Sequence, residues 1–224
     1  MQRLVERGIA GTPASNLVAM AIWLYSMPRP VSQTDAILVL PGQGEDWRLN
    51  DAVAAWNNCP NARYLLVAGN YKGERTWFLP TIEILRERYG LTRTEGVLIH
   101  PHAHHTKEQS DWIIPTIQEL GLTSISLFVS PYHLLRAFCC ILKAFTRHDV
   151  PQIPMIPVPV LVSPTTPVPE TGITGWDLVH GEVERILKYT EFGDVATPEE
   201  LMSYLDWLFR QPIITNATSA SMYT

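Results

Sequence analysis

Short apolar runs that alternate with segments of helical spacing constrain the fold of this chain more than any other feature of its sequence. The runs are rich in Val, Ile and Leu and have no polar face, which is typical of parallel strands buried on both sides. The segments between them carry apolar residues at helical intervals. The predicted strands span residues 35–41, 63–68, 96–99, 124–129 and, as an edge strand with prolines around it, 158–162.

This alternation predicts an α/β protein built from right-handed βαβ units. We expect a three-layer α/β/α Rossmann-like sandwich with a mostly parallel sheet of about five strands, plus N- and C-terminal helices. A chain of 224 residues fits one such domain with extensions. The predicted single domain, 1–224, has an N-terminal docking helix at 1–30, a Rossmann-like core at 35–190, a C-terminal helix at 195–210 and a flexible tail at 212–224.

The apolar run from Leu17 to Met27 is the segment that could span a membrane or serve as a signal peptide. It is shorter than the roughly 20 apolar residues that a membrane span needs. A signal peptide is the alternative, because Arg3 and Arg7 precede the run. Glu6 and the Pro28-Arg29-Pro30 sequence disfavour a signal peptide, so we predict a helix that packs on the domain and no membrane span.

Charge and cysteine content narrow the class of partner and the compartment. The formal net charge is -5 at pH 7, and basic residues never run beyond a pair, so nucleic acid is disfavoured as a partner. The cysteines, Cys59, Cys139 and Cys140, fit neither a disulfide framework nor a zinc site. We therefore predict a cytoplasmic protein whose partner is a small-molecule ligand.

The stretch from Ser130 to Ala137 lies where the fourth predicted strand passes into a helix. In open parallel sheets, ligands bind in the crevice beyond the carboxyl ends of the strands. His133 is a candidate general acid or base, with Tyr132 and Arg136 within one helical turn of it. Ser130 could donate a hydrogen bond or act as a nucleophile, although no GxSxG elbow surrounds it. The alternative is that His133 caps the helix or packs locally.

Two glycine turns follow the first and second predicted strands. Gly42-Gln43-Gly44 allows backbone amides to approach a ligand, although a GxG without a third glycine is equally a tight turn after a strand. Arg48, on the next helix, can clamp a carboxylate or phosphate, or remain a solvated arginine. Gly69-Asn70 ends the second strand on the same edge, and Glu74 either faces the crevice or lies on the surface.

Four of the seven histidines fall between His100 and His105. Imidazole binds several transition metals, so a metal-dependent hydrolase built on this cluster is one interpretation. The cluster lacks an HExxH spacing and partner cysteines, and alternate residues at a strand end point apart. A polar loop at the mouth of the pocket is therefore favoured, with no metal and with His105 a candidate ligand contact.

The helix that follows opens with Thr106-Lys107-Glu108-Gln109. Thr106 can cap this helix, and Gln109 then completes a capping box. Both residues are also candidates for contact with a ligand, and the two roles are compatible. Glu108 lies at a helix N-terminus, which favours its ionised form, so it would act as a base or as the partner of a cation.

The order and spacing of these motifs resemble those of the YdcF/SanA/ElyC-like family of uncharacterised Rossmann-like α/β domains. The resemblance covers roughly residues 35–190, and the block at 130–137 matches best. The matching positions are Asp35 to Gly44, Arg48, Ala68 to Asn70, Glu74, His105 to Gln109, Ser130, Tyr132, His133, Arg136 and Ala137.

This resemblance implies a Rossmann-like fold and a polar pocket, without a settled reaction. Two family asparagines are replaced here, by His105 and Gln109. No full membrane anchor is visible at the N-terminus, so the chain is closest to the soluble YdcF-like type. That type has been associated with S-adenosylmethionine, which makes S-adenosylmethionine a possible cofactor.

We therefore expect an enzyme that transfers or hydrolyses a group on an anionic, nucleotide-like small molecule. In this hypothesis Arg48 and Arg136 bind the anion, while His133 with Glu108 supplies acid/base chemistry and Tyr132 orients the substrate. A non-catalytic sensor with the same binding residues is the alternative, and the metal hydrolase is a weaker one.

Overall fold

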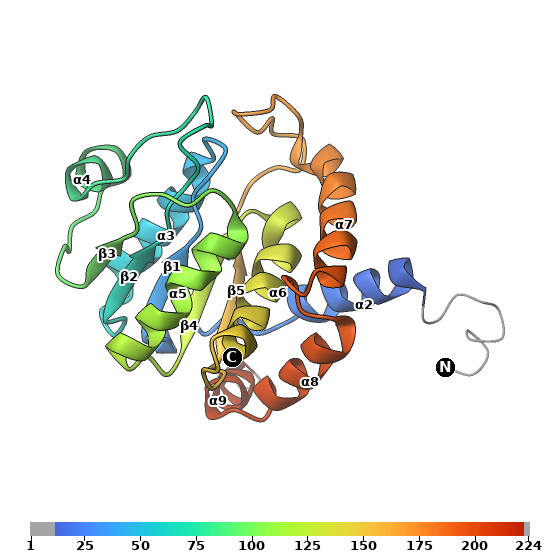
Figure 1. The fold of residues 1–224 in the computed structure, drawn as a ribbon. Coiled ribbons are helices and arrows are strands. Elements are labelled where there is room, and N and C mark those ends of the chain that lie inside the picture. The colour runs from blue at the N-terminus through green and yellow to red at the C-terminus, as the bar shows by residue number, and fades with distance from the viewer. Residues whose placement is uncertain (1–11, 222–224) are drawn as a thin grey trace.

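The computed structural model describes residues 12–221, with side chains as far as residue 217, and contains one five-stranded sheet (Figure 1). Every pairing of neighbouring strands is parallel, and their order is β3-β2-β1-β4-β5. This architecture confirms the predicted α/β sandwich. The strands are β1 (Ala36–Val39), β2 (Tyr64–Val67), β3 (Val97–Ile99), β4 (Ile125–Val129) and β5 (Met155–Pro159).

The edge strand lies at a different place from the one predicted. β5 starts at Met155, not at residue 158, and its register pairs Ile125 with Met155. Met155 and Ile156 are fully buried, and this apolar burial decides where the strand forms. The sequence pattern missed it because prolines interrupt the run. Proline is tolerated here because an edge strand has one side without a partner strand.

Alternate residues of each strand face opposite sides of the sheet, so two separate cores form. Ile37 and Val39 pack with α3 and α4 on one side, while Ala36 and Leu38 pack with α5 and α6 on the other. α7 lies against α6, farther from the sheet (Figure 1). The helices are α3 (Asp46–Asn58), α4 (Ile82–Tyr89), α5 (Thr106–Leu120), α6 (Pro131–Arg147) and α7 (Gly175–Glu191).

The N-terminal helix α2 (Pro13–Tyr25) begins at the capping residue Thr12, whose side chain accepts a hydrogen bond from the Ser15 amide. Its buried residues join the core on the α6 side of the sheet, so the helix packs on the domain. The predicted docking segment before residue 12 lies outside the described residues. None of the helices within residues 12–221 is both long and apolar enough to cross a membrane.

Two helices end the described chain. α8 (Pro198–Leu208) opens with a capping box formed by Thr197 and Glu200. The segment predicted as a flexible tail from residue 212 forms a helix, α9 (Pro212–Ser221), as far as residue 221. Ile214 on α9 is buried in the core, and this contact outweighs the small, polar composition of the segment. Residues 222–224 lie outside the described residues.

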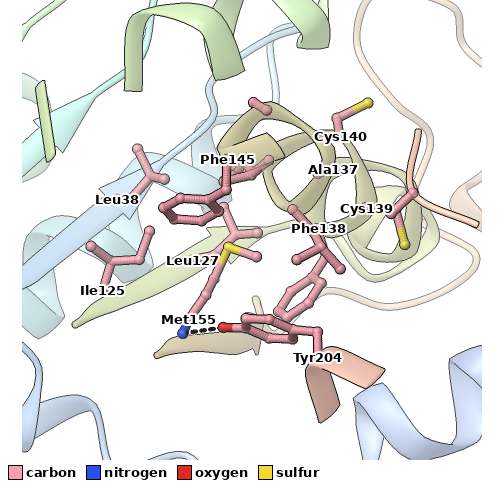
Figure 2. Close-up of a cluster of buried hydrophobic side chains, with 14 of the residues drawn as sticks. Leu38, Ile125, Leu127, Ala137, Phe138, Cys139, Cys140, Phe145, Met155 and Tyr204 are labelled. Carbon is pink, nitrogen blue, oxygen red and sulfur yellow. Dashed lines mark hydrogen bonds between the residues drawn. The ribbon is translucent and has the colours of Figure 1, made fainter. Parts of the chain in front are cut away.

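The core beneath α6 is dense and contains a satisfied polar group (Figure 2). Tyr204 packs edge-on against Phe138, while its hydroxyl donates to the Ile153 carbonyl and accepts from the Met155 amide, at 2.8 Å each. Tyr204 thus ties α8 to the edge strand. Cys139 is free and fully buried in this core, and burial raises the pKa of its thiol, so it acts as a small apolar residue.

Candidate functional site

A cavity of about 290 Å³ lies beyond the carboxyl ends of the strands. It is lined by the turns after β1, β2 and β3 together with the helices α5, α6 and α7. Eleven of the fifteen predicted site residues line it: Gly42, Gln43, Arg48, Asn70, Glu74, His105, Thr106, Gln109, Tyr132, His133 and Arg136. Gly44, Gly69, Glu108 and Ser130 are not among its lining residues.

Gly44 and Gly69 do not line the cavity, but the turns beside it require glycine at both positions. Gly44 has a φ of +69°, a conformation that favours glycine, and a Cβ there would lie 2.8 Å from the side chain of Thr76. A Cβ on Gly69 would lie 2.4 Å from the backbone of His102. Glycine is therefore required where the turn after β2 meets the turn after β3.

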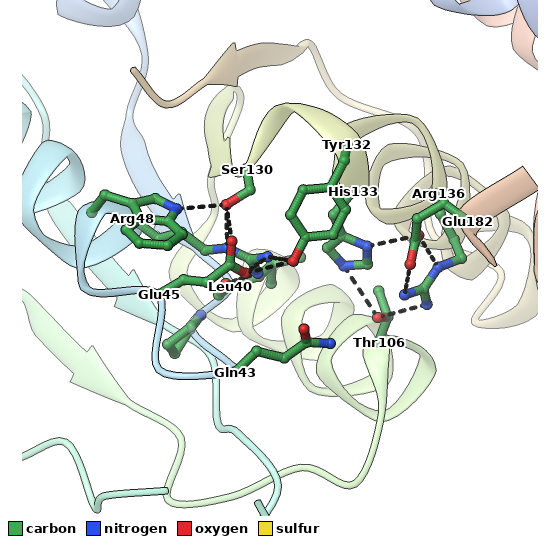
Figure 3. A network of polar contacts seen from close by, with 12 residues as sticks. Leu40, Gln43, Glu45, Arg48, Thr106, Ser130, Tyr132, His133, Arg136 and Glu182 are labelled. Carbon is green, nitrogen blue, oxygen red and sulfur yellow. Dashed lines mark hydrogen bonds and ion pairs between the residues drawn. The ribbon is translucent and has the colours of Figure 1, made fainter. Parts of the chain in front are cut away.

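One buried network, which we call the Glu45 network, consists of Glu45, Trp47, Arg48, Ser130 and Tyr132 (Figure 3). The Ser130 hydroxyl donates to Glu45 at 2.6 Å and accepts from Trp47 and Arg48 at 2.9 Å each. The Tyr132 hydroxyl donates to the same carboxylate at 2.9 Å. Both hydroxyl protons are thus committed to Glu45.

Arg48 is satisfied within this network. Its Nε donates to Ser130 and its Nη1 to the carbonyl of Leu40, while its Nη2 pairs with Glu45 and contacts Tyr132. The predicted anion clamp therefore holds a carboxylate of the chain itself. Ser130 is wholly buried and its hydroxyl donates to Glu45, so this geometry favours its role as a hydrogen-bond donor over the alternative role of a nucleophile. Glu45 went unnoticed in the sequence because it follows a glycine turn with no motif of its own.

A second buried network, the Glu182 network, joins α5, α6 and α7 (Figure 3). His133 Nδ1 lies 3.0 Å from Glu182 Oε2, and His133 Nε2 lies 3.4 Å from the Thr106 hydroxyl. Arg136 donates twice to Glu182, at 2.5 and 3.1 Å, and once to Thr106 at 3.0 Å. Arg185 adds a hydrogen bond of 3.0 Å from the rim of the cavity.

The charge states in this network fix the proton positions. Burial and the nearby charge of Arg136 lower the pKa of His133 to about 4, although Glu182 opposes the shift, so the imidazole is neutral at pH 7. Burial alone would raise the pKa of Glu182, but its interactions with His133, followed by its hydrogen bonds and ion pair with Arg136, hold it well below its usual value. An ionised carboxylate only accepts, so His133 carries its proton on Nδ1 and leaves a lone pair on Nε2.

Glu182, and not Glu108, is the carboxylate that contacts His133. The Glu108 side chain is 42% exposed, and its carboxylate accepts from the backbone and the ring of His104 at 2.7 and 2.8 Å. These hydrogen bonds lower the pKa of Glu108. The sequence carries one signal for Glu182, since this acid lies one helical turn before the buried Ile186, on the apolar face of α7.

Thr106 does not cap α5 as predicted. The capping residue is His105, whose Nδ1 accepts from the Glu108 amide at 3.2 Å. Thr106 is therefore the first residue of the helix, and its hydroxyl is free to join the Glu182 network. The Gln109 amide donates to the carbonyls of Gly69, at 2.6 Å, and Pro41, at 3.3 Å, which ties together the ends of two strands.

The opposite wall of the cavity carries amide oxygens that lack a donor. Gln43 Oε1 and Asn70 Oδ1 are buried and have no hydrogen-bond partner among the residues that the structure describes. The Gln43 side chain lies between the two networks (Figure 3). The carboxylate of Glu74 accepts a hydrogen bond from the backbone amide of Gln43 at 2.8 Å, and burial raises the pKa of Glu74. Buried acceptors of this kind cost free energy until a donor reaches them.

The histidine cluster lies beside a second hollow, which is lined by His100, His102, His104 and Glu108 among others. The rings of His100 and His102 stack at a centroid distance of 6.3 Å, and those of His102 and His104 lie 6.4 Å apart. Within residues 12–221, no group of three metal-ligating side chains is arranged to hold an ion. The described geometry thus gives no support to the interpretation of this cluster as a metal centre.

No family model matches the chain, and no curated protein matches it either. The resemblance to YdcF-like proteins therefore depends on the short motifs alone.

Proposed function

We propose that this protein is a hydrolase or transferase that acts on a small polar molecule in the sheet-edge cavity, with His133 as general base. The observation that carries this proposal is the geometry of His133, whose ring lies between the Glu182 carboxylate and the Thr106 hydroxyl. Glu182 fixes its tautomer, and its Nε2 lone pair lies beside a hydroxyl that lines the cavity. A buried histidine held in this way can accept a proton at neutral pH.

The lining of the cavity suggests what kind of ligand binds. Lys107 and Arg185 are cations on the rim, with side chains 41% and 47% exposed. Lys107 pairs with Asp194 at 3.3 Å and Arg185 with Glu182 at 3.0 Å, while Arg136 lies deeper. These charges suit an anionic group at the mouth. Gln43 Oε1 and Asn70 Oδ1 suit hydroxyl or amino groups farther in.

Nucleotide-like molecules combine an anionic group with hydroxyl and amino donors. S-adenosylmethionine, which the resemblance to YdcF-like proteins suggests, carries a carboxylate together with ribose hydroxyls and falls in the same class. We propose both as ligands to be tested, because their functional groups match the cationic rim and the amide wall.

A screen of turnover tests the proposal. Purified protein is offered p-nitrophenyl acetate, p-nitrophenyl phosphate, nucleotides and S-adenosylmethionine, and products are followed by absorbance and mass spectrometry. We expect turnover of at least one compound, and a fall of about 10²- to 10⁴-fold in the His133→Gln variant. His148→Gln is the matched control, since His148 pairs with Asp111 and does not line the cavity.

The opposing outcome is also defined. If nucleotides or S-adenosylmethionine bind equally well to the wild type and to His133→Gln, and no compound turns over, the protein is a binding or sensor module and the enzymatic proposal is wrong.

A further inference from the structure

We propose that the Thr106 hydroxyl is the nucleophile of this site, and that the substrate is a carboxylic ester whose acyl group is carried transiently on Thr106. This inference rests on the proposed function and adds a covalent step to it. Hydroxyl, imidazole and carboxylate stand in sequence as Thr106, His133 and Glu182 (Figure 3). Such a triad is identified by geometry and roles and not by its order in the chain.

The proton of the Thr106 hydroxyl has one destination. Arg136 Nη1 donates to Thr106 Oγ1 at 3.0 Å, so the oxygen already accepts a hydrogen bond there. Neutral His133 has only a lone pair at Nε2, so the Thr106 hydroxyl donates across the 3.4 Å contact. That distance is long for a hydrogen bond, as contacts between a nucleophile and its base often are before substrate binds.

The other nucleophilic side chains near the cavity are less suited. The Tyr132 and Ser130 hydroxyls donate to the carboxylate of Glu45, which has no role in proton transfer to a ring nitrogen. Cys140 lines the cavity, but burial raises the pKa of its thiol to about 12, so the reactive thiolate is scarce. Thr106 is the hydroxyl in the described lining that contacts a neutral base.

The place of Thr106 in the fold favours negative charge on its oxygen. It is the first residue of α5, whose N-terminal end carries a partial positive charge. The guanidinium of Arg136 lies within hydrogen-bond distance of the same oxygen. Thr106 is only 7% exposed, so water competes little with these groups.

The reaction balances without a further reagent. Thr106 Oγ1 forms a bond to the ester carbonyl carbon as His133 Nε2 takes the hydroxyl proton. The bond from that carbon to the alcohol oxygen then breaks, and His133 returns the proton to the departing alcohol. Water next gives a proton to His133 and attacks the acyl-threonine, and Thr106 leaves with the proton. The sum is ester plus water giving acid plus alcohol.

Covalent labelling tests this role directly. The protein is mixed with p-nitrophenyl acetate, or with diisopropyl fluorophosphate as a probe that depends little on the acyl group, and the adduct is located by peptide mass spectrometry. We expect one adduct on the peptide that contains Thr106, in the wild type and in Thr106→Ser. Labelling falls to background in Thr106→Val and in His133→Gln.

The control is another threonine of the same helix. Thr116 is also 7% exposed, but its hydroxyl donates to the Trp112 carbonyl at 2.8 Å and does not line the cavity. Thr116→Val therefore loses a buried hydroxyl without touching the site, and we expect it to label like the wild type. Circular dichroism of each variant shows that it is folded.

Two results separate this inference from the proposed function. Turnover that depends on His133 but persists in Thr106→Val, without an adduct, means that water is the nucleophile, so the inference fails and the proposed function stands. Absence of turnover on every compound together with absence of labelling by both probes overturns the inference and counts against the proposed function.

Discussion

The two buried networks on either side of Tyr132 contain similar residues but differ in how completely those residues are hydrogen-bonded within the protein. In each, a carboxylate that is at most 4% exposed pairs with an arginine, and that arginine donates a hydrogen bond to a hydroxyl. The Glu45 network contains only groups whose hydrogen bonds are complete within the protein. The Glu182 network contains an imidazole with a lone pair beside the cavity. Position at the sheet edge therefore does not distinguish the two networks, whereas the imidazole beside the cavity does, and our proposal assigns the chemistry to it.

The largest expected effect is on turnover in Glu182→Gln. The amide keeps the shape of the side chain but no longer fixes the His133 tautomer or stabilises a protonated ring. We expect kcat to fall by about 10²- to 10⁴-fold. The assay is steady-state turnover per folded molecule, with the folded fraction taken from circular dichroism.

Glu184→Gln is the control for this variant, because Glu184 is exposed on the same helix and does not line the cavity. Turnover of Glu182→Gln within a few-fold of that of the control would contradict the division between the two networks.

The next effect is on stability, in Glu45→Gln. Removing one partner of a buried ion pair leaves the other charge uncompensated, and Arg48 is 4% exposed. We expect the free energy of unfolding to fall by about 3–5 kcal/mol, measured by urea denaturation. Glu87→Gln, at an exposed position on α4, should change it by less than about 0.5 kcal/mol. A small decrease in the free energy of unfolding of Glu45→Gln would mean that the Glu45 network contributes little to the stability of the fold.

The fold was predictable because its signals are local. The runs that became β1 to β4 are mainly apolar, with Ser126 as the exception. A parallel sheet covered on both faces buries such runs, as it does for β1, β4 and most of β2. β5 was misplaced because prolines obscure its pattern. α9 was missed because two neighbouring residues, Ile213 and Ile214, pack an otherwise small and polar segment against the core. Both errors concern tertiary burial that a local pattern does not record.

The sequence predicts where the candidate site lies, but it does not predict which residues form hydrogen bonds with one another there. Residues at the ends of β1, β2, β3 and β4 meet at one edge, because parallel strands all end there. The partners of those residues depend on how helices pack across the edge. Glu182 comes from α7, 46 residues beyond Arg136 along the chain. Glu108 is closer in sequence to His133, but the hydrogen bonds from His104 hold it outside the cavity.

A third prediction concerns pH. His133 has a pKa of about 4 in the folded protein and an ordinary value of 6.5, so the unfolded chain binds more protons between these limits. The free energy of unfolding therefore falls as pH drops from about 6.5 to about 4. The loss is about 3 kcal/mol, since one unit of pKa difference corresponds to about 1.4 kcal/mol. The lowered pKa of Glu182 acts in the same direction but only below its ordinary value of 4.5.

Urea denaturation at several pH values measures this dependence, and His133→Gln should remove most of it above pH 5. The same protonation sets activity, because the base must be neutral. We expect kcat/KM to fall with an apparent pKa near 4. An apparent pKa near 6.5 in both measurements would show that the His133 ring is solvated like that of a surface histidine. The Glu182 network would then not be buried in solution.

The smallest effect separates the rim of the Glu182 network from its interior. Arg185 makes one hydrogen bond to Glu182 and its side chain is 47% exposed, whereas Arg136 makes two and is 13% exposed. Solvent screens the outer pair, so Arg185→Gln should lower the free energy of unfolding by only about 0.2–1 kcal/mol. Arg136→Gln should lower the free energy of unfolding by about 3–5 kcal/mol, because it leaves a buried carboxylate without its main partner.

Urea denaturation in low and high salt tests both values. Salt should abolish only the loss in Arg185→Gln, since only exposed pairs are screened. Equal losses in the two variants would mean that Arg185, like Arg136, belongs to the buried interior, which would leave Lys107 as the cation at the rim that could receive an anion.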